Sequence, residues 1–243
     1  MANSVAALFV ALVFGLAIRS SFAGTAAAPD NKTPSESDPC GALDPLATDK
    51  FLSDNWLGAR TWLHGRGVDI DASYQGEVFT NSGGANHSMI FDGMFNLGLT
   101  FDLCRLTGFW EGATLHANAL YIYGPSLSRE YIGDFSNTSN IAGYNSVRLQ
   151  ELWLQQKFWN GQASIRLGLL AADMEFFSSD SSSLFLNSTF GAFNILSQNF
   201  SNAPIYPIAN PAVRLDFQPT PKFDFKVSFS SDNEISDPTT TNQ

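Results

Sequence analysis

The stretch FDGMFNLGLTFDL, residues 91–103, decides the fold of this chain. Apolar and polar residues alternate through it, so that Phe91 and Phe95 share one face while Asp92 and Asn96 lie on the other. Side chains two residues apart on a β-strand point to the same side, and this period of two predicts a strand with one apolar and one polar face. The strand is about twice the length of a typical strand in a soluble sheet, which has roughly five or six residues.

The same alternation recurs along most of the chain. It is found in residues 68–78, 113–123, 163–169, 213–218 and 223–230. Residues 147–159 also predict a strand, but its faces are mixed, because Arg148 has the same parity as Leu152. Strands of about ten residues are long enough to cross a bilayer when they are tilted. The pattern therefore predicts antiparallel strands that span a membrane.

The connections between these strands alternate in length. Residues 104–111 and 160–162 make short connections, whereas residues 81–90 and 124–146 make longer ones. Short turns at one rim and long loops at the other are typical of a transmembrane β-barrel. The main alternative is a secreted β-sandwich that binds glycans, since its strands also alternate.

Composition supports a two-faced wall and excludes some functions. Only 15% of the 243 residues are charged, 13% are aromatic, and the formal net charge is −10. The acidic balance argues against nucleic-acid binding, which needs a basic surface. The polar face of the predicted strands carries Asp, Glu, Asn, Thr and Arg, so we expect a wetted lumen rather than a solid apolar interior.

The amino-terminal residues carry the features of an export signal. An apolar run over residues 5–18 is short for a membrane helix, and it is followed by a small-x-small site that ends at Ala23. We expect residues 1–23 to be a signal peptide, residues 24–50 a flexible leader, and residues 51–243 a barrel domain. A retained membrane anchor is the alternative for the first segment.

The two cysteines leave their pairing open. Cys40 lies in the expected leader and Cys104 in an expected turn. A bridge between them and two free thiols both remain compatible with the sequence, because nothing in the spacing fixes the distance between the two residues.

Several motifs, in order along the chain, carry a family resemblance. They are NWLGAR at residues 55–60, RLQELW at 148–153, IRLG at 165–168 and LFLNS at 184–188. This series resembles the carbohydrate-selective porins of the OprB family, and the resemblance extends over about residues 55–229. It implies an outer-membrane barrel of about sixteen strands through which small sugars diffuse inward without a cofactor. Its partners would be outer-membrane lipid, small sugars and sister subunits in a homotrimer.

The fold that we expect is therefore an all-β transmembrane antiparallel barrel of the porin type, with a short helix before the first strand. Only seven or eight strands are predicted here, so we expect an incomplete barrel, the amino-terminal portion of a longer porin. A closed eight-stranded barrel is the other arrangement, although its interior is too narrow for a sugar channel.

Polar residues on the lumen face are the candidates for contact with a sugar. They are Asp69, Glu77, Asp92, Asn96, Asn118, Arg148, Glu151, Arg166 and Arg214. Arginine suits this role because its planar fork of donors can bridge two adjacent hydroxyls. The alternative for each residue is a solvated lumen side chain or a charge that braces the wall. In the expected helix, Arg60 helps to gate the lumen; the alternative is that Trp56 and Leu63 merely anchor the segment at the membrane interface.

Catalysis has little support in the sequence. His116 and Ser164 suggest an outer-membrane hydrolase, but no nucleophile, base and orienting group occur together. The histidines have no metal-ligand spacing, so we expect no metal site and no enzyme activity.

Overall fold

The computed structural model describes residues 8–12, 40, 43, 46, 52–177, 184–190, 204–220 and 222–231. Its strands are β1 (Leu8–Leu12), β2 (Val68–Ser82), β3 (Met89–Asp102), β4 (Ala113–Tyr123), β5 (Ser146–Phe158), β6 (Ala163–Leu170), β7 (Asn210–Thr220) and β8 (Phe223–Ser230). Its α-helices are α1 (Ala59–His64) and α2 (Leu103–Thr107), and short helical turns cover Trp56–Gly58, Ser128–Ile132, Ala172–Met174 and Ser188–Phe190. No helix among these residues is long and apolar enough to cross a membrane.

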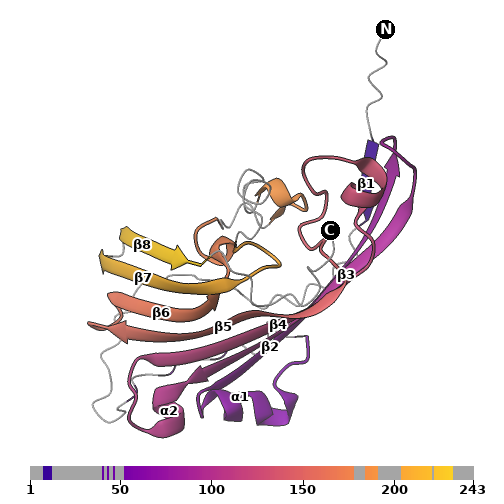
Figure 1. Ribbon diagram of the computed structural model, residues 1–243. Helices are drawn as coiled ribbons and strands as arrows, with labels where there is room; N and C mark the ends of the chain where they lie inside the picture. The colour runs from indigo at the N-terminus through magenta and orange to yellow at the C-terminus, as the bar shows by residue number, and fades with distance from the viewer. Residues whose placement is uncertain are drawn as a thin grey trace.

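The strands form one antiparallel sheet in sequence order, β1 to β8. Figure 1 shows that the sheet is strongly curved, with a concave and a convex face. Among the described strands β8 pairs with β7 alone, so the sheet is open rather than a closed eight-stranded barrel. The prediction of an all-β antiparallel fold with a helix before the long strands is confirmed, and the two packed sheets of a sandwich are not found among these strands.

Strand β1 lies within the expected signal peptide and pairs with the last residues of β2. Removal of residues 1–23 stays a prediction. The site described below depends on β2 to β8 only.

The two faces of the sheet differ as the alternation predicts. On the convex face, the large apolar side chains of successive strands are exposed: Phe91 (47%), Leu152 (41%), Leu167 (44%), Leu215 (45%) and Phe229 (66%). On the concave face the charged and amide side chains are mostly buried. An apolar outer band with a polar interior is the arrangement that a membrane barrel requires, because a charge facing lipid costs about 2–4 kcal/mol near the bilayer midplane.

A β-bulge explains the mixed faces of β5. Asn118 of β4 pairs with Glu151, but Ala119 pairs with Leu149, so Gln150 is an extra residue on β5. An extra residue reverses the parity of a strand. Arg148 and Glu151 are therefore both buried on the concave face, although their spacing in sequence would place them on opposite faces of a regular strand.

Aromatic side chains mark both ends of the sheet. Near the long-loop end, the hydroxyls of Tyr74 and Tyr123 lie 2.5 Å apart, and Tyr121 stacks on Tyr123. Gly93 makes room for this cluster, because a Cβ there would lie 2.6 Å from the Tyr123 ring. At the short-turn end, Trp110, Phe158, Trp159, Phe217 and Phe223 are exposed. Two such girdles are typical of the membrane interfaces of a barrel.

The connection between β3 and β4 contains α2 instead of the simple turn expected around Cys104. Asp102 caps this helix, because its Oδ1 accepts hydrogen bonds from the backbone N–H of Cys104 (2.9 Å) and of Arg105 (3.2 Å). Cys104 forms a disulfide with Cys40, with the two Cα atoms 5.6 Å apart. The pairing that the sequence left open is thus a bridge from residue 40 to the short-turn end of the sheet.

Two segments between β6 and β7 are joined to each other over the concave face. The backbone N–H of Ala172 donates to the carbonyl of Pro204 (2.6 Å), and the N–H of Tyr206 donates to Oδ2 of Asp173 (2.9 Å). Oδ1 of Asp173 is shielded from solvent and has no hydrogen-bond partner among the described residues. This shielding raises the pKa of Asp173 from 3.8 to about 6, because burial penalises the charged form. Burial also raises the pKa of Tyr206.

The disulfide should protect both cysteines from thiol reagents. We expect no maleimide labelling of the unfolded chain until a reductant is added, because both sulfur atoms are in the Cys40–Cys104 bridge. Replacing both cysteines by serine should lower the free energy of unfolding by about 2–4 kcal/mol. Mass spectrometry after labelling checks the first point, and labelling of both residues without reduction would contradict the bridge.

The raised pKa of Asp173 predicts a pH dependence of stability. A carboxyl whose pKa is higher in the folded state stabilises the fold most when it is protonated, so its contribution should fall as pH rises from about 4 to about 6. Asp173→Asn keeps an acceptor for the Tyr206 N–H but does not titrate. The difference in thermal midpoint between wild type and Asp173→Asn should therefore change between pH 4 and pH 7, and a constant difference would refute the assignment.

Candidate functional site

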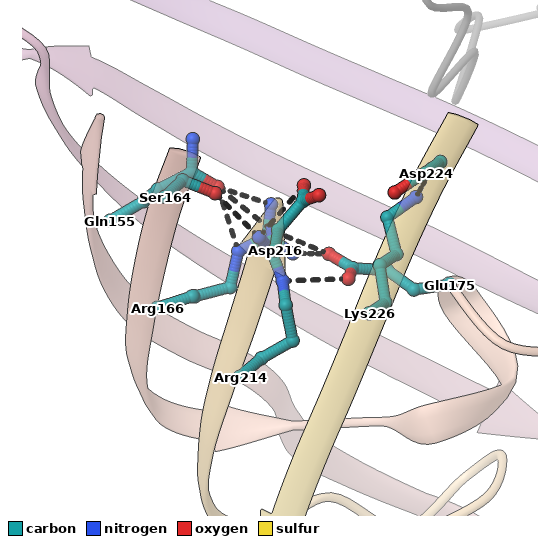
Figure 2. Close-up of polar contacts among 8 residues, drawn as sticks. All are labelled: Gln155, Ser164, Arg166, Glu175, Arg214, Asp216, Asp224 and Lys226. Atoms are coloured by element: carbon teal, nitrogen blue, oxygen red, sulfur yellow. Dashed lines mark hydrogen bonds and ion pairs between the residues drawn. The ribbon is translucent and has the colours of Figure 1, made fainter. Parts of the chain in front are cut away.

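Two arginines face each other on the concave side of the sheet. Arg166 of β6 pairs directly with Arg214 of β7, which brings two like charges together. Glu175, from the segment after β6, lies beside the pair and contacts both arginines (Figure 2). Its carboxylate accepts from Nη1 of Arg166 and from Nη2 of Arg214 (3.0 Å), and its Oε2 lies in ion-pair contact with Nε of Arg214 (2.8 Å). Glu175 thus neutralises a pair that would otherwise repel.

Gln155 of β5 completes the link between the two arginines. Its Oε1 accepts from Nε (3.1 Å) and Nη2 (2.8 Å) of Arg166 and from Nη2 of Arg214 (3.0 Å). Nη1 of Arg214 donates to Oγ of Ser164 (2.6 Å) and to Oδ2 of Asp216 (3.2 Å). Figure 2 shows that Lys226 and Asp224, on the next strand, continue this set of charges.

A count of donors separates the two arginines. A guanidinium group has five N–H donors. Arg214 directs both hydrogens on each terminal nitrogen at described acceptors, and its Nε lies in ion-pair contact with Oε2 of Glu175 (2.8 Å) without a hydrogen bond. Arg166 uses its Nε and one hydrogen on each terminal nitrogen. Within the described part of the chain, no acceptor takes the second hydrogen on Nη1 or on Nη2 of Arg166. On its terminal nitrogens, Arg166 therefore keeps one N–H on each for a ligand, whereas those of Arg214 are all used.

Aromatic stacking holds Arg166 in place from one side. Its guanidinium carbon lies 3.8 Å from the centroid of the Trp153 ring, and the His116 ring also stacks on Trp153 at 4.8 Å. His116 in turn is hydrogen-bonded through Nδ1 to Oγ1 of Thr100 (2.8 Å). This stack fixes the plane of the fork, since a cation over a tryptophan face is attracted by the ring.

A cavity of about 190 Å³ lies against the arginine pair. Its lining includes Glu151, Arg166, Glu175, Phe176, Arg214, Ser228 and Ser230. The volume equals that of several water molecules, each of which occupies about 30 Å³ in the liquid. The lining thus offers donors, acceptors and an aromatic side chain around one small space whose other walls are apolar: Leu170, Ala171, Ala172, Pro204 and Ala212.

The predicted lumen residues do not all meet at this cavity. Glu151, Arg166 and Arg214 line it, and these are the three members of the predicted set that the structure brings together. Asn118 donates through Nδ2 to Oδ1 of Asn96 (2.5 Å), nearer the middle of the sheet.

Three more of the predicted residues are buried toward the long-loop end. Glu77 pairs with Asp92 two positions from the apolar pair Phe79 and Ile90, and the two acids are only 2% and 4% exposed. Arg148 donates to the carbonyl of Pro207 (3.2 Å). The Arg148 contact fits a wall-bracing role, the alternative that the sequence left open, and the roles of Glu77 and Asp92 stay predictions.

At the short-turn end, the remaining predicted residues lie at the start of β2 and in the helical segment before it. Oδ1 of Asp69 is hydrogen-bonded to Nδ1 of His64 at 2.6 Å. Arg60 is buried, donates through Nη1 to the carbonyl of Ile70 (2.9 Å), and lies 4.3 Å from the Trp56 ring. These contacts tie Arg60 to the first strand and to Trp56, and its part in gating stays a prediction.

The sequence did not single out three residues of the site. Trp153 and Gln155 point inward because the bulge at Gln150 reverses the parity of β5, and that reversal is hidden in a simple period count. Glu175 lies in an irregular segment with no period to assign its direction. The one feature of the sequence that pointed to Trp153 and Gln155 was the motif at residues 148–153, which ends at Trp153 and lies two residues before Gln155.

The two residues that suggested a hydrolase, Ser164 and His116, are each bonded to other side chains. Oγ of Ser164 accepts from Arg214, while His116 is hydrogen-bonded to Thr100 and stacked on Trp153. In the described ranges, no group of three or more His, Cys, Asp and Glu side chains is placed to hold a metal ion.

Comparisons with known proteins agree on one family. Porin B of Pseudomonas aeruginosa is 27% identical over 136 residues, which are 52% of this chain and 30% of that protein. The high pH structure of Pseudomonas putida OprB matches with a TM-score of 0.66 and 26% identity, over 77% of this chain and 46% of that one. The chain thus spans less than half the length of the relatives that it matches.

The family description "Carbohydrate-selective porin, OprB family" matches residues 86–241, which is more than half of the chain. This match includes β3 to β8 and every residue that lines the cavity. It confirms the resemblance noted in the motifs, and with it the porin-type barrel wall and the outer-membrane location. The chain belongs to the OprB family of carbohydrate-selective porins.

Proposed function

We propose that this chain forms part of the wall of a passive channel that admits small neutral sugars through the outer membrane. The observation that carries the proposal is the pair of unused N–H donors on Arg166, a residue that lines the cavity. A planar fork with two adjacent donors matches two neighbouring hydroxyl oxygens on a sugar ring.

The other cavity residues complete a site for a polyhydroxyl molecule. The Glu151 carboxylate offers an acceptor for a sugar hydroxyl, and Ser228 and Ser230 offer hydroxyls. Phe176 offers an aromatic surface for the C–H face of the ring. These groups replace the hydrogen bonds to water that a sugar gives up when it enters a narrow passage.

The charge balance of the cavity favours a neutral solute. Its lining contains two guanidinium groups, of Arg166 and Arg214, and two carboxylates, of Glu151 and Glu175. An ion of either sign would meet both an attractive and a repulsive group at close range, whereas a neutral sugar can bond to both. Selectivity for sugars over simple ions follows from this balance.

We also propose that the channel works without catalysis or a cofactor. The relatives are named as porins, and Ser164 and His116 are engaged with other side chains. Lipid would cover the convex face, whose exposed large apolar residues suit a hydrocarbon environment. Assembly as a homotrimer rests on the family resemblance alone.

Arg166→Gln tests the sugar site. In the channel made from the complete gene product, we expect the sugar concentration that half-blocks single-channel conductance to rise about thirtyfold, because two hydrogen bonds of about 1 kcal/mol each are lost. Lys226→Gln is the matched control, since it removes the same charge on β8 outside the cavity. Equal shifts in the two variants would move the sugar site elsewhere, and a folded wild-type channel that no sugar blocks would refute the function.

Arg214→Lys should act on stability more than on sugar binding. Lysine cannot reproduce the bonds that Arg214 makes to Ser164, Gln155, Glu175 and Asp216 at once. We expect a lower thermal midpoint in detergent, by several degrees, than for Arg166→Gln. If Arg166→Gln is the less stable of the two, the division of roles between the arginines is wrong.

A further inference from the structure

Tyr206 links three parts of the structure without lining the cavity. Its backbone N–H donates to Oδ2 of Asp173 (2.9 Å), in the segment after β6. Its phenol hydroxyl donates to the carbonyl of Ile141 (2.7 Å), in the long loop between β4 and β5, and lies 3.4 Å from Sδ of Met94 on β3. One side chain therefore spans from the segment before β7 to the opposite loop and to the wall.

Its neighbours fasten the same short segment. The carbonyl of Pro204 accepts from the N–H of Ala172 (2.6 Å), and the carbonyl of Pro207 accepts from Nη1 of Arg148 (3.2 Å). Ile205 and Ala209 are buried, with 8% and 0% of their surfaces exposed. Residues 204–209 are thus held by polar bonds on several sides, and Tyr206 provides the bond to the far loop.

This segment in turn positions Glu175. Asp173 and Glu175 belong to one tight turn, in which the carbonyl of Ala172 accepts from the N–H of Glu175 (3.4 Å) and of Phe176 (2.9 Å). A turn of this kind moves as a unit, so the place of Asp173 sets the direction of the Glu175 side chain. Glu175 then holds Nη1 of Arg166 and thereby directs the two unused donors.

We propose that Tyr206 is a positioning residue for sugar binding, which acts through Asp173 and Glu175 on the fork of Arg166. The proposal rests on the proposed function, because it concerns the affinity of the same site. Tyr206 is not among the residues that line the cavity, so its effect on a sugar must pass through the turn.

The hydroxyl of Tyr206 can be removed with little other change. Tyr206→Phe keeps the ring and the backbone bond to Asp173 but loses the bond to Ile141. The segment then has one fewer anchor, and Glu175 samples positions in which Arg166 is less well directed. A hydrogen bond of about 1 kcal/mol corresponds to a change of about fivefold in affinity.

The experiment is single-channel recording in planar bilayers with the complete gene product and glucose as the probe. For Tyr206→Phe we expect the half-blocking glucose concentration to rise about fivefold, with an open channel and unchanged heat-modifiable migration on gels. Tyr144→Phe is the matched control, because Tyr144 is an exposed tyrosine of the β4–β5 loop that contacts Arg129 through its ring. An unchanged half-blocking concentration in Tyr206→Phe would overturn the proposal.

A double-mutant cycle distinguishes positioning from a general loss of stability. If Tyr206 acts through Glu175, then Tyr206→Phe should add almost nothing to the effect of Glu175→Gln. Additive effects would overturn the proposal and leave the sugar site intact. If Tyr206→Phe does not insert, Asp173→Ala cuts the next bond of the same path, from the Tyr206 N–H to Asp173, and should shift the half-blocking concentration in the same direction. A wild-type channel that glucose does not block refutes the proposed function itself, a result distinct from each of these.

Discussion

A wall between hydrocarbon and water can carry charge on one side only, and the rest of this structure depends on that constraint. Lipid offers no partner for a charged side chain, so each strand must direct its charges to the concave face. The regular alternation of β3 and β6 achieves this directly. Strand β5 achieves it with an extra residue at Gln150, which brings Arg148 and Glu151 to the same face.

Charges that are concentrated on one face can repel one another, as the pair Arg166 and Arg214 illustrates. Arg166 and Arg214 are direct neighbours on adjacent strands, and they are tolerable together only because Glu175 and Gln155 accept from both. Glu175 comes from a connecting segment, so the wall alone does not complete the site. The division of donors follows from this arrangement: both terminal nitrogens of the more enclosed Arg214 are fully bonded, while Arg166, which lines the cavity, retains two N–H groups.

The strands and their inner faces were predictable because lipid imposes a period of two. Asp92, Asn96 and Asn118 lie inward as the alternation indicates. The period of two no longer predicts the direction of a side chain where the strand departs from regular pairing. A bulge cannot be located by counting parity, so Trp153 was missed and Glu151 had no assigned direction. Glu175 lies in a segment whose path depends on contacts with residues 204–207, and these contacts are distant in sequence. The Cys40–Cys104 bridge was undecided for a similar reason, since spacing does not determine proximity.

That bridge also changes the topology of the chain. Cys40 and Cys104 are 64 positions apart in sequence and joined through sulfur, so the backbone between them is a covalent ring. The ring contains α1, β2 and β3, the first long hairpin of the wall together with the helix that precedes it. A single break in the backbone anywhere within it would leave both new ends attached to the same molecule. The first part of the wall is thus a closed loop, and the strands from β4 onward extend from it as an open chain.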